Sequence, residues 1–416
     1  MLIMKNLLKF FNKEKLKRYG LLLFFSFFIS FIPYVREVVA SFIDDFLIKV
    51  ENKLSYLSKN KAEDFVFVYI DGNTLESWNA KLKPLLPRDK LAKLIAKISE
   101  DNPKIIFVDV FFDFKGNKRE DKKLENTLRN ILKKKDITFI FPVSLEIYEN
   151  NKLKPLAYFP YFYKDLKKYK DKIILSVPLF FSFKNENDGV IRYFGYKIDA
   201  SYMLRDREKD IELYNSAVVI YRRYKNLKDN EVDITNSDFV RSRIRYLLNM
   251  NKKNFNSISA DEVLNSESNL NSENKINFKD KVVIIGVDYS FKEKKYKTPI
   301  GNIAGIYLIG NTIFTLDGHL LKDNIILSLV LSFTMLLVFS LNFRRKIITI
   351  PLNIIALIIF YFVSFTLFHW YNYLLILFIV FYLFVIGEFM KTVSDTVIKW
   401  LWESIVIKLK EKIFNK

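Results

Sequence analysis

Four long apolar runs constrain the fold of this chain more than any other feature of its sequence. The first run, residues 19–35, follows a basic leader, residues 1–18. The other three, residues 325–341, 347–370 and 373–387, follow one another with only short loops between them. A helix of about 20 apolar residues spans a hydrocarbon core of about 30 Å. The pattern therefore predicts four transmembrane helices, one N-terminal and three C-terminal.

Basic residues beside these runs predict the topology. The leader holds six Lys or Arg against the single acid Glu14, and Arg344, Arg345 and Lys346 lie between the second and third runs. Such residues collect on the cytoplasmic side of a membrane. We expect a multi-pass protein of the cell inner membrane, with both termini in the cytoplasm and residues 36–323 forming one large extracytoplasmic domain.

A cleaved signal peptide is the alternative interpretation of the first run. Val38, Val39 and Ala40 offer small residues at the spacing of a cleavage site. However, Arg36 and Glu37 lie between the apolar segment and that site, and the segment is longer than a typical signal core. We therefore favour an uncleaved anchor.

The formal net charge of +20 does not indicate a nucleic-acid partner. Residues 1–18, 344–346 and 388–416 contribute +5, +3 and +2, so half of the excess flanks the apolar runs. The remaining charge is dispersed, without the arginine-rich arm of nucleic-acid binding segments. We expect no nucleic-acid partner.

Catalytic residue types are scarce in this sequence. The chain has no cysteine and only two histidines. This composition excludes disulfides, a cysteine nucleophile, and a histidine-based triad or zinc cluster in the large domain. We expect neither enzymatic activity nor a cofactor.

Residues 36–323 alternate strand and helix patterns. Phe65–Ile70 and residues 105–108 are apolar strands, and residues 87–98 between them carry one apolar helical face. A further helix, with Leu124, Leu128, Ile131 and Leu132, leads to a strand at 137–141, and residues 281–285 supply another short strand. A short helix is expected where Ser259 and Glu262 form a capping box. The fold class is α/β, a layered sandwich with a mostly parallel sheet, because strands this apolar are buried on both faces.

Charged residues gather where the first two strands end. Asp71 and Asp109 follow these strands, Arg88 and Asp89 begin the helix between them, and Asp113 lies in the second loop. Ligands of parallel sheets bind outside the carboxyl ends of the strands. The residues form either a ligand or cation site or a structural set, in which the aspartates cap helices and Arg88 pairs with one of them.

Five ordered motifs carry a resemblance to a known family. They are Phe67-Val68-Tyr69-Ile70-Asp71, Leu86-Pro87-Arg88-Asp89-Lys90-Leu91-Ala92, residues 103–112 (PKIIFVDVFF), Asp188-Gly189-Val190-Ile191-Arg192, and residues 278–286 (FKDKVVIIG), followed by Thr298-Pro299, Gly305 and Asn311. In this order they resemble the type 2 CHASE domain, an extracellular sensor family associated with cyclases and histidine kinases. The resemblance adds Arg192 to the candidate ligand-binding residues and implies three transmembrane helices after the domain.

Two positions depart from the family pattern. Ile309 stands where the family has a histidine in its GVEVHAN-like stretch. Lys294-Lys295-Tyr296-Lys297 replaces the aspartate usual before Thr-Pro. The resemblance implies sensing without naming the signal, so the ligand is not identified.

Two further segments suggest partners. Apolar residues at helical spacing between Val39 and Leu57 either pack on the domain or form the seam of a parallel homodimer. Residues 388–416 are too few for a kinase or cyclase domain. Their apolar stripe predicts an amphipathic helix that lies on the inner membrane surface or docks on a separate cytoplasmic signalling protein.

These observations favour a signal-input protein. Its outer domain binds a ligand or partner and changes the packing of the transmembrane helices. The alternative is a constitutive membrane scaffold whose outer domain binds a protein partner without a switch.

The topology predicts opposite labelling at two positions. A single cysteine at Lys170 should react with an impermeant thiol reagent on intact cells whose outer barrier is permeabilised, whereas one at Lys346 should not. The cysteine-free chain supplies a clean background. Labelling at Lys346 with protection at Lys170 would contradict the topology.

Overall fold

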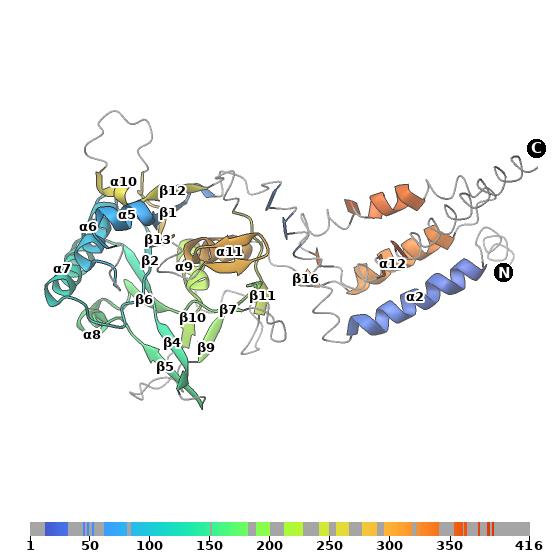
Figure 1. Cartoon of the computed structure of the whole chain (residues 1–416), viewed down its shortest axis with the longest axis horizontal. Coiled ribbons are helices and arrows are strands. Elements are labelled where there is room, and N and C mark those ends of the chain that lie inside the picture. Colours follow the sequence, from blue (N-terminus) through green and yellow to red (C-terminus); the bar gives the residue numbers. More distant parts are fainter. Residues whose placement is uncertain are drawn as a thin grey trace, which may run out of the picture. The chain divides into compact units, whose positions relative to one another are not determined.

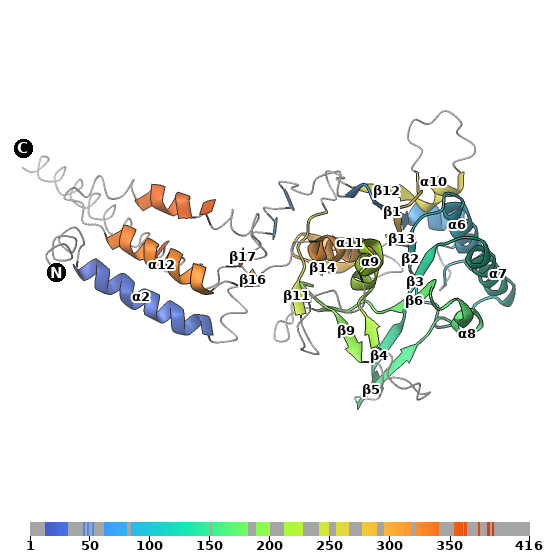
Figure 2. The same cartoon turned by 180° about the vertical axis from the view of Figure 1, so that it is seen from behind.

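The computed structural model divides the chain into two compact units, residues 48–320 and residues 1–47 with 321–416. It describes residues 13–31, 45, 48–49, 52–53, 62–80, 85–149, 152–181, 189–199, 212–227, 241–248, 255–265, 277–288, 295–317, 322–323, 325–340, 353–360, 362–363, 373–374, 381–382 and 385–386. Both units are drawn in Figures 1 and 2.

A six-stranded sheet forms the centre of the larger unit. Its order is β12 (Asn256–Ser259), β1 (Phe65–Ile70), β13 (Val282–Val287), β2 (Ile105–Asp109), β3 (Thr138–Pro142) and β6 (Ile173–Ser176). All neighbouring strands are parallel. The predicted α/β class and mostly parallel sheet are confirmed. The sequence interpretation missed the two edge strands β12 and β6, which are short and only partly apolar.

Helices cover both faces of this sheet (Figures 1 and 2). On one face lie α5 (Gly72–Ser77), α6 (Arg88–Glu100), α7 (Lys118–Lys134) and α10 (Ala260–Asn265). On the other face lie α9 (Ser216–Lys225) and α11 (Gly305–Leu316). The strands alternate accordingly: Val66 and Val68 belong to the core beneath α6 and α7, whereas the Phe67 ring packs on Tyr307 of α11.

Smaller elements complete the larger unit. Antiparallel pairs are formed by β4 (Ser144–Glu149) with β5 (Lys152–Tyr158), β9 (Lys197–Asp199) with β10 (Glu212–Tyr214), and β14 (Tyr296–Thr298) with β15 (Gly301–Ile303). Strands β7 (Phe180–Phe181), β8 (Tyr193–Gly195) and β11 (Arg241–Arg243) form a three-stranded sheet. The short helices α8 (Tyr163–Leu166) and η1 (Lys167–Tyr169) precede β6.

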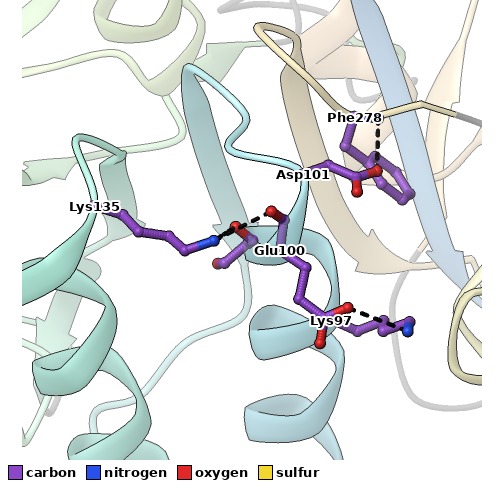
Figure 3. A network of polar contacts seen from close by, with 6 residues as sticks. Lys97, Glu100, Asp101, Lys135 and Phe278 are labelled. Atoms are coloured by element: carbon purple, nitrogen blue, oxygen red, sulfur yellow. Dashed lines mark hydrogen bonds and ion pairs between the residues drawn. The ribbon is translucent and has the colours of Figure 1, made fainter.

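Helix termini are held by polar side chains from neighbouring segments. The predicted capping box of α10 is confirmed, because Ser259 N donates to Glu262 Oε2 at 3.1 Å. At the C-terminal end of α6, Lys135 donates to the carbonyls of Ser99 and Glu100, and Asp101 accepts from Phe278 N at 3.3 Å (Figure 3). These contacts tie the end of α6 to the segments after α7 and before β13. The opposite end, with Arg88, is thereby positioned at the carboxyl edge of the sheet.

The smaller unit consists of helices with an apolar core. It contains α2 (Lys13–Phe31), α12 (Ile325–Ser340) and a helical segment at residues 353–360. Its buried residues include Met335, Phe339, Phe360 and Phe381. Short strands β16 (Lys322–Asp323) and β17 (Tyr373–Leu374) pair in parallel, so Tyr373 begins a strand where the sequence predicted the start of a helix.

No helix within the described ranges combines the length and the apolar character needed to cross a membrane. The four transmembrane helices therefore stay a prediction. The predicted amphipathic tail, residues 388–416, lies outside the described residues, as do most of residues 39–57 and the loop with Lys346.

Helix α11 approaches the sheet closely because glycines lie in the contact. A methyl group at Gly286 of β13 would lie 2.3 Å from Ile306 Cγ2 of α11. A methyl group at Gly310 of α11 would lie 2.6 Å from Phe67 Cζ of β1. Real Cβ atoms do not tolerate such distances, so a side chain at either position would separate the helix from the sheet.

We therefore predict that Gly310→Ala destabilises the protein by about 1 to 3 kcal/mol through overpacking against the buried Phe67 ring. Chemical unfolding of the full-length protein measures this loss. Gly116→Ala is the matched control and should change the free energy of unfolding little, because its methyl group would meet no atom closer than 3.6 Å. Equal effects of the two substitutions would contradict the close contact of α11 with the sheet.

Candidate functional site

Aspartates follow the three central strands at the carboxyl edge of the sheet. Asp71 follows β1, Asp288 follows β13, and Asp109 is the last residue of β2. Asp71 and Asp288 continue the parallel register of their strands, since Asp288 N donates to Ile70 O at 3.0 Å. The parallel order of the strands therefore places these carboxylates along one edge, where ligands of such sheets bind.

Asp71 has a structural role at this edge. It is the N-cap of α5, and its Oδ1 accepts from Thr74 N at 2.8 Å and from Thr74 Oγ1 at 2.7 Å. Thr74 Oγ1 lies 2.9 Å from Ser259 Oγ, at the end of the neighbouring strand β12. The carboxylate satisfies backbone and hydroxyl donors that would otherwise be unpaired at the helix start.

Asp288 and two tyrosines form a second polar group that the sequence interpretation missed. Lys295 Nζ lies 3.3 Å from Asp288 Oδ1, and Tyr307 of α11 hydrogen-bonds the same carboxylate. Burial raises the pKa of Tyr307, and Asp288 raises it further. Burial also raises the pKa of Tyr69, with Glu262 and Asp71 adding to the shift. Extending the predicted strand by two residues, to Val287, would have placed Asp288 at its carboxyl end.

Asp109 is buried where β2 meets the start of α11. Its side chain is 8% exposed, and burial raises the pKa of its carboxyl group from 3.8 to about 7. A methyl group at Gly305, the first residue of α11, would lie 2.8 Å from Asp109 Oδ2. The carboxyl group thus lies directly against a helix N-terminus, whose partial positive charge interacts with the ionised form.

Arg88 is buried at the first turn of α6. Its side chain is 2% exposed, and its Cζ lies 4.4 Å from the centre of the Phe112 ring. Within the described part of the chain, its Nε and Nη1 atoms have no hydrogen-bond partner. Burial lowers the pKa of Arg88, while Tyr161 and the acids Asp121, Asp113 and Glu120 oppose that shift. The guanidinium is therefore charged, surrounded by acids and incompletely hydrogen-bonded.

The neighbours of Arg88 come from the start of α7. Glu120 Oε2 accepts from Arg88 N at 3.1 Å, which supplies an acceptor at a helix start where Pro87 offers none. Asp121 Oδ2 accepts from Gly116 N at 2.8 Å, and its buried Oδ1 has no partner among the described residues. Burial and Asp121 both raise the pKa of Tyr161. Asp121 was missed by the sequence interpretation, although it precedes Leu124 on the buried side of α7.

The predicted site residues thus do not form a single site. Arg88 and Asp113 belong to one group, which Asp121, Glu120 and Tyr161 complete. Asp71 and Asp109 belong to the sheet edge, and Asp89 is half-buried in the first turn of α6. Arg192 is buried beside the three-stranded sheet, where its N donates to Phe181 O and its O accepts from Ile244 N.

A metal site is not found in this arrangement. Among the residues that the structure describes, no three His, Cys, Asp or Glu side chains lie close enough together to hold a metal ion. The candidate chemistry of the site is therefore that of a buried guanidinium with carboxylates around it. Such a group recognises charged organic ligands through charge-assisted hydrogen bonds.

The larger unit is thus a layered α/β domain with charged groups at the carboxyl edge of its sheet, and a comparison with protein families identifies its family. The model of the CHASE2 domain matches residues 21–341. Because this match covers more than half of the chain, the protein belongs to the CHASE2 family, a family of sensor domains, which supports a sensory role. The resemblance noted from the motifs is thereby confirmed. The chain matches no curated protein and no solved structure.

The raised pKa of Asp109 predicts a pH dependence of stability. A carboxyl group whose pKa is raised in the folded state contributes stability below its unfolded pKa of 3.8, and this is lost as the pH rises through about 7. The full difference amounts to at most about 4 kcal/mol. Relative to Asp109→Asn, the free energy of unfolding of the unmodified protein should fall between pH 4 and 7 and then level off.

Denaturant unfolding at a series of pH values checks this expectation. Asp171→Asn, at an exposed position, is the control and should leave the pH dependence unchanged. If the free energy of unfolding varies with pH in the same way for the unmodified protein and for Asp109→Asn, the pKa of Asp109 is not raised in the folded state.

Proposed function

We propose that this protein is a membrane-bound extracytoplasmic sensor. Residues 48–320 bind a small ligand outside the cytoplasm, and the transmembrane helices relay binding to a separate cytoplasmic signalling protein. The observation that carries the proposal is the CHASE2 match over residues 21–341, which includes most of the first apolar run, the domain and the second apolar run.

Outward-facing apolar side chains support the membrane part of the proposal. Helix α12 buries Met335 and Phe339 in the apolar core of the smaller unit. Its side chains Ile326, Val330 and Phe333 are exposed. On α2, Leu21, Phe24 and Phe25 are likewise exposed. Helices that are apolar around their whole circumference are typical of membrane surroundings or of a protein interior.

Contacts within the larger unit, together with the chain connection from α11 to α12, support the relay. The Arg88 guanidinium lies over Phe112, and the chain leads back from Phe112 to Asp109 in three residues. Asp109 lies against Gly305 at the start of α11. Residues 317–324 then connect the end of α11 to α12. A ligand that holds the loop after β2 in one position can therefore act on α11, provided that it binds two arrangements of this contact with different affinity.

The alternative function is a constitutive scaffold. Leu85, Phe111 and Phe114 are exposed near the start of α6 and α7, and Phe114 is 64% exposed. Exposed apolar side chains in one region are typical of protein interaction surfaces. A scaffold binds its partner through such a surface without a change in the helices, whereas a sensor changes helix packing on binding.

Crosslinking within the smaller unit distinguishes these functions. Tyr19 of α2 and Phe339 of α12 lie in contact, with ring centroids 6.1 Å apart, so cysteines at both positions can be joined by a short bifunctional thiol reagent in the otherwise cysteine-free chain. We expect the crosslinking rate in membranes to change several-fold with a compound that stabilises the full-length protein, found by screening L-amino acids, simple sugars, small anions and divalent cations.

The same cysteine pair combined with Arg88→Gln should lose the response to the compound. Identical crosslinking with and without every stabilising compound would contradict the sensor and favour the scaffold.

A further inference from the structure

We propose that the cluster at the start of α6 and α7 binds an α-amino acid with an apolar side chain. The cluster consists of Arg88, Asp113 and Asp121, with Leu85, Phe111 and Phe114 around it. This inference rests on the proposed sensory function and names the class of ligand that the same site recognises. Three features of the site, each with its own chemistry, point to the three groups of such a molecule.

The first feature is the unsatisfied guanidinium. Arg88 is 98% buried by area (100% less its 2% exposure), and neither its Nε nor its Nη1 has a hydrogen-bond partner within the described ranges. Unpaired donors in such a place are costly, most of all on a charged group. Stacking on Phe112 stabilises the face of the cation but satisfies none of its N–H donors. A ligand carboxylate supplies the acceptors that these N–H groups lack.

The second feature is an excess of carboxylates around that cation. Asp121, Asp113 and Glu120 all interact with the one guanidinium. A simple anion would supply acceptors to Arg88 but no donor to these carboxylates. Asp121 Oδ1 is also buried without a partner among the described residues. An ammonium group on the ligand donates to Asp121 and Asp113, so a zwitterion satisfies both signs of charge at once.

The third feature is an exposed apolar rim. Within residues 48–320, the large apolar side chains that the structure describes as exposed are Leu85, Phe111 and Phe114. All three flank the charged cluster in sequence: Leu85 precedes Arg88 by three residues, Phe111 immediately precedes Phe112, and Phe114 immediately follows Asp113. An apolar side chain on the ligand would pack on these three residues and remove their apolar surface from water.

The choice of an amino acid follows from combining the three features. A carboxylate alone leaves the acids uncompensated, and an amine alone leaves Arg88 unsatisfied. An α-amino acid carries both charged groups on one carbon atom, which suits a cation and carboxylates held at neighbouring helix starts. The apolar rim then favours leucine or phenylalanine over acidic or basic amino acids.

The test is calorimetric titration of the purified full-length protein with L-phenylalanine and L-leucine. Phenylpropanoate, which lacks the ammonium group, and phenethylamine, which lacks the carboxylate, are the matched ligand controls. We expect saturable binding of both amino acids and binding at least about tenfold weaker for either control, because each leaves buried charge unpaired.

Substitutions test which side chain binds the carboxylate of the ligand and which binds its ammonium group. Arg88→Gln should weaken phenylalanine binding about tenfold or more. Arg222→Gln is the matched control, since Arg222 is also buried and lies over an aromatic ring, with Cζ 4.7 Å from the centre of Tyr214. If Arg88→Gln does not fold, Asp113→Asn decides: at this half-buried position it should weaken phenylalanine but not phenylpropanoate.

The outcomes separate this inference from the proposed function. Absence of saturable amino-acid binding up to about 10 mM would overturn the inference, as would binding that Arg88→Gln and Asp113→Asn leave unchanged. If another compound class binds and alters crosslinking of the helices, the ligand class is wrong and the sensor stands. If phenylalanine binds through Arg88 without altering crosslinking, the site stands and the sensor is wrong.

Discussion

The contact between helix α11 and the central strands β1 and β13 is the constraint on which the rest of this domain depends. It exists because Gly286 and Gly310 leave no side chain where the helix meets the sheet. Interiors are packed to the density of organic crystals, so a contact this close admits few positions of the helix. The start of α11 is consequently held over the end of β2, and Gly305 lies against the Asp109 carboxyl group. Burial of that group follows from the same contact.

The two charged regions at the carboxyl edge differ in how completely their groups are satisfied. Around Asp71 the donors and acceptors match: the carboxylate accepts from the amide and the hydroxyl of Thr74, and that hydroxyl reaches Ser259. Around Arg88 they do not match, because buried nitrogens and a buried Asp121 oxygen have no partners among the described residues. A satisfied group stabilises the fold by itself, whereas an unsatisfied one gains stability when a ligand supplies the missing partner.

Much of the fold follows from local sequence pattern. The strand Phe65–Ile70 and the helix that begins near Arg88 were predicted at their observed positions, because apolar spacing reflects the faces that the layers bury. Edge strands such as β12, with the sequence Asn-Ser-Ile-Ser, carry no such pattern. Most side chains of this strand are only partly buried, so they need not be apolar. Their pairing is decided by tertiary contacts.

The candidate site was predictable only in part, for the same reason. The position of Arg88 and Asp113 near the end of a parallel strand follows from topology. Their association with Asp121, from the helix after the second strand, depends on how α6 and α7 pack against each other, which residue spacing does not reveal. Arg192, which family resemblance added, lies beside another sheet because its backbone pairs with Phe181 and Ile244.

In the proposed relay, a ligand at Arg88 acts on α11 through the loop that joins Asp109 to Phe112. Hydrogen–deuterium exchange of the full-length protein, with and without saturating L-phenylalanine, tests it most directly. We expect slower exchange in residues 110–117 together with a change in residues 305–316 of α11. Protection confined to the loop and the start of α6, with exchange in α11 unchanged, would contradict it.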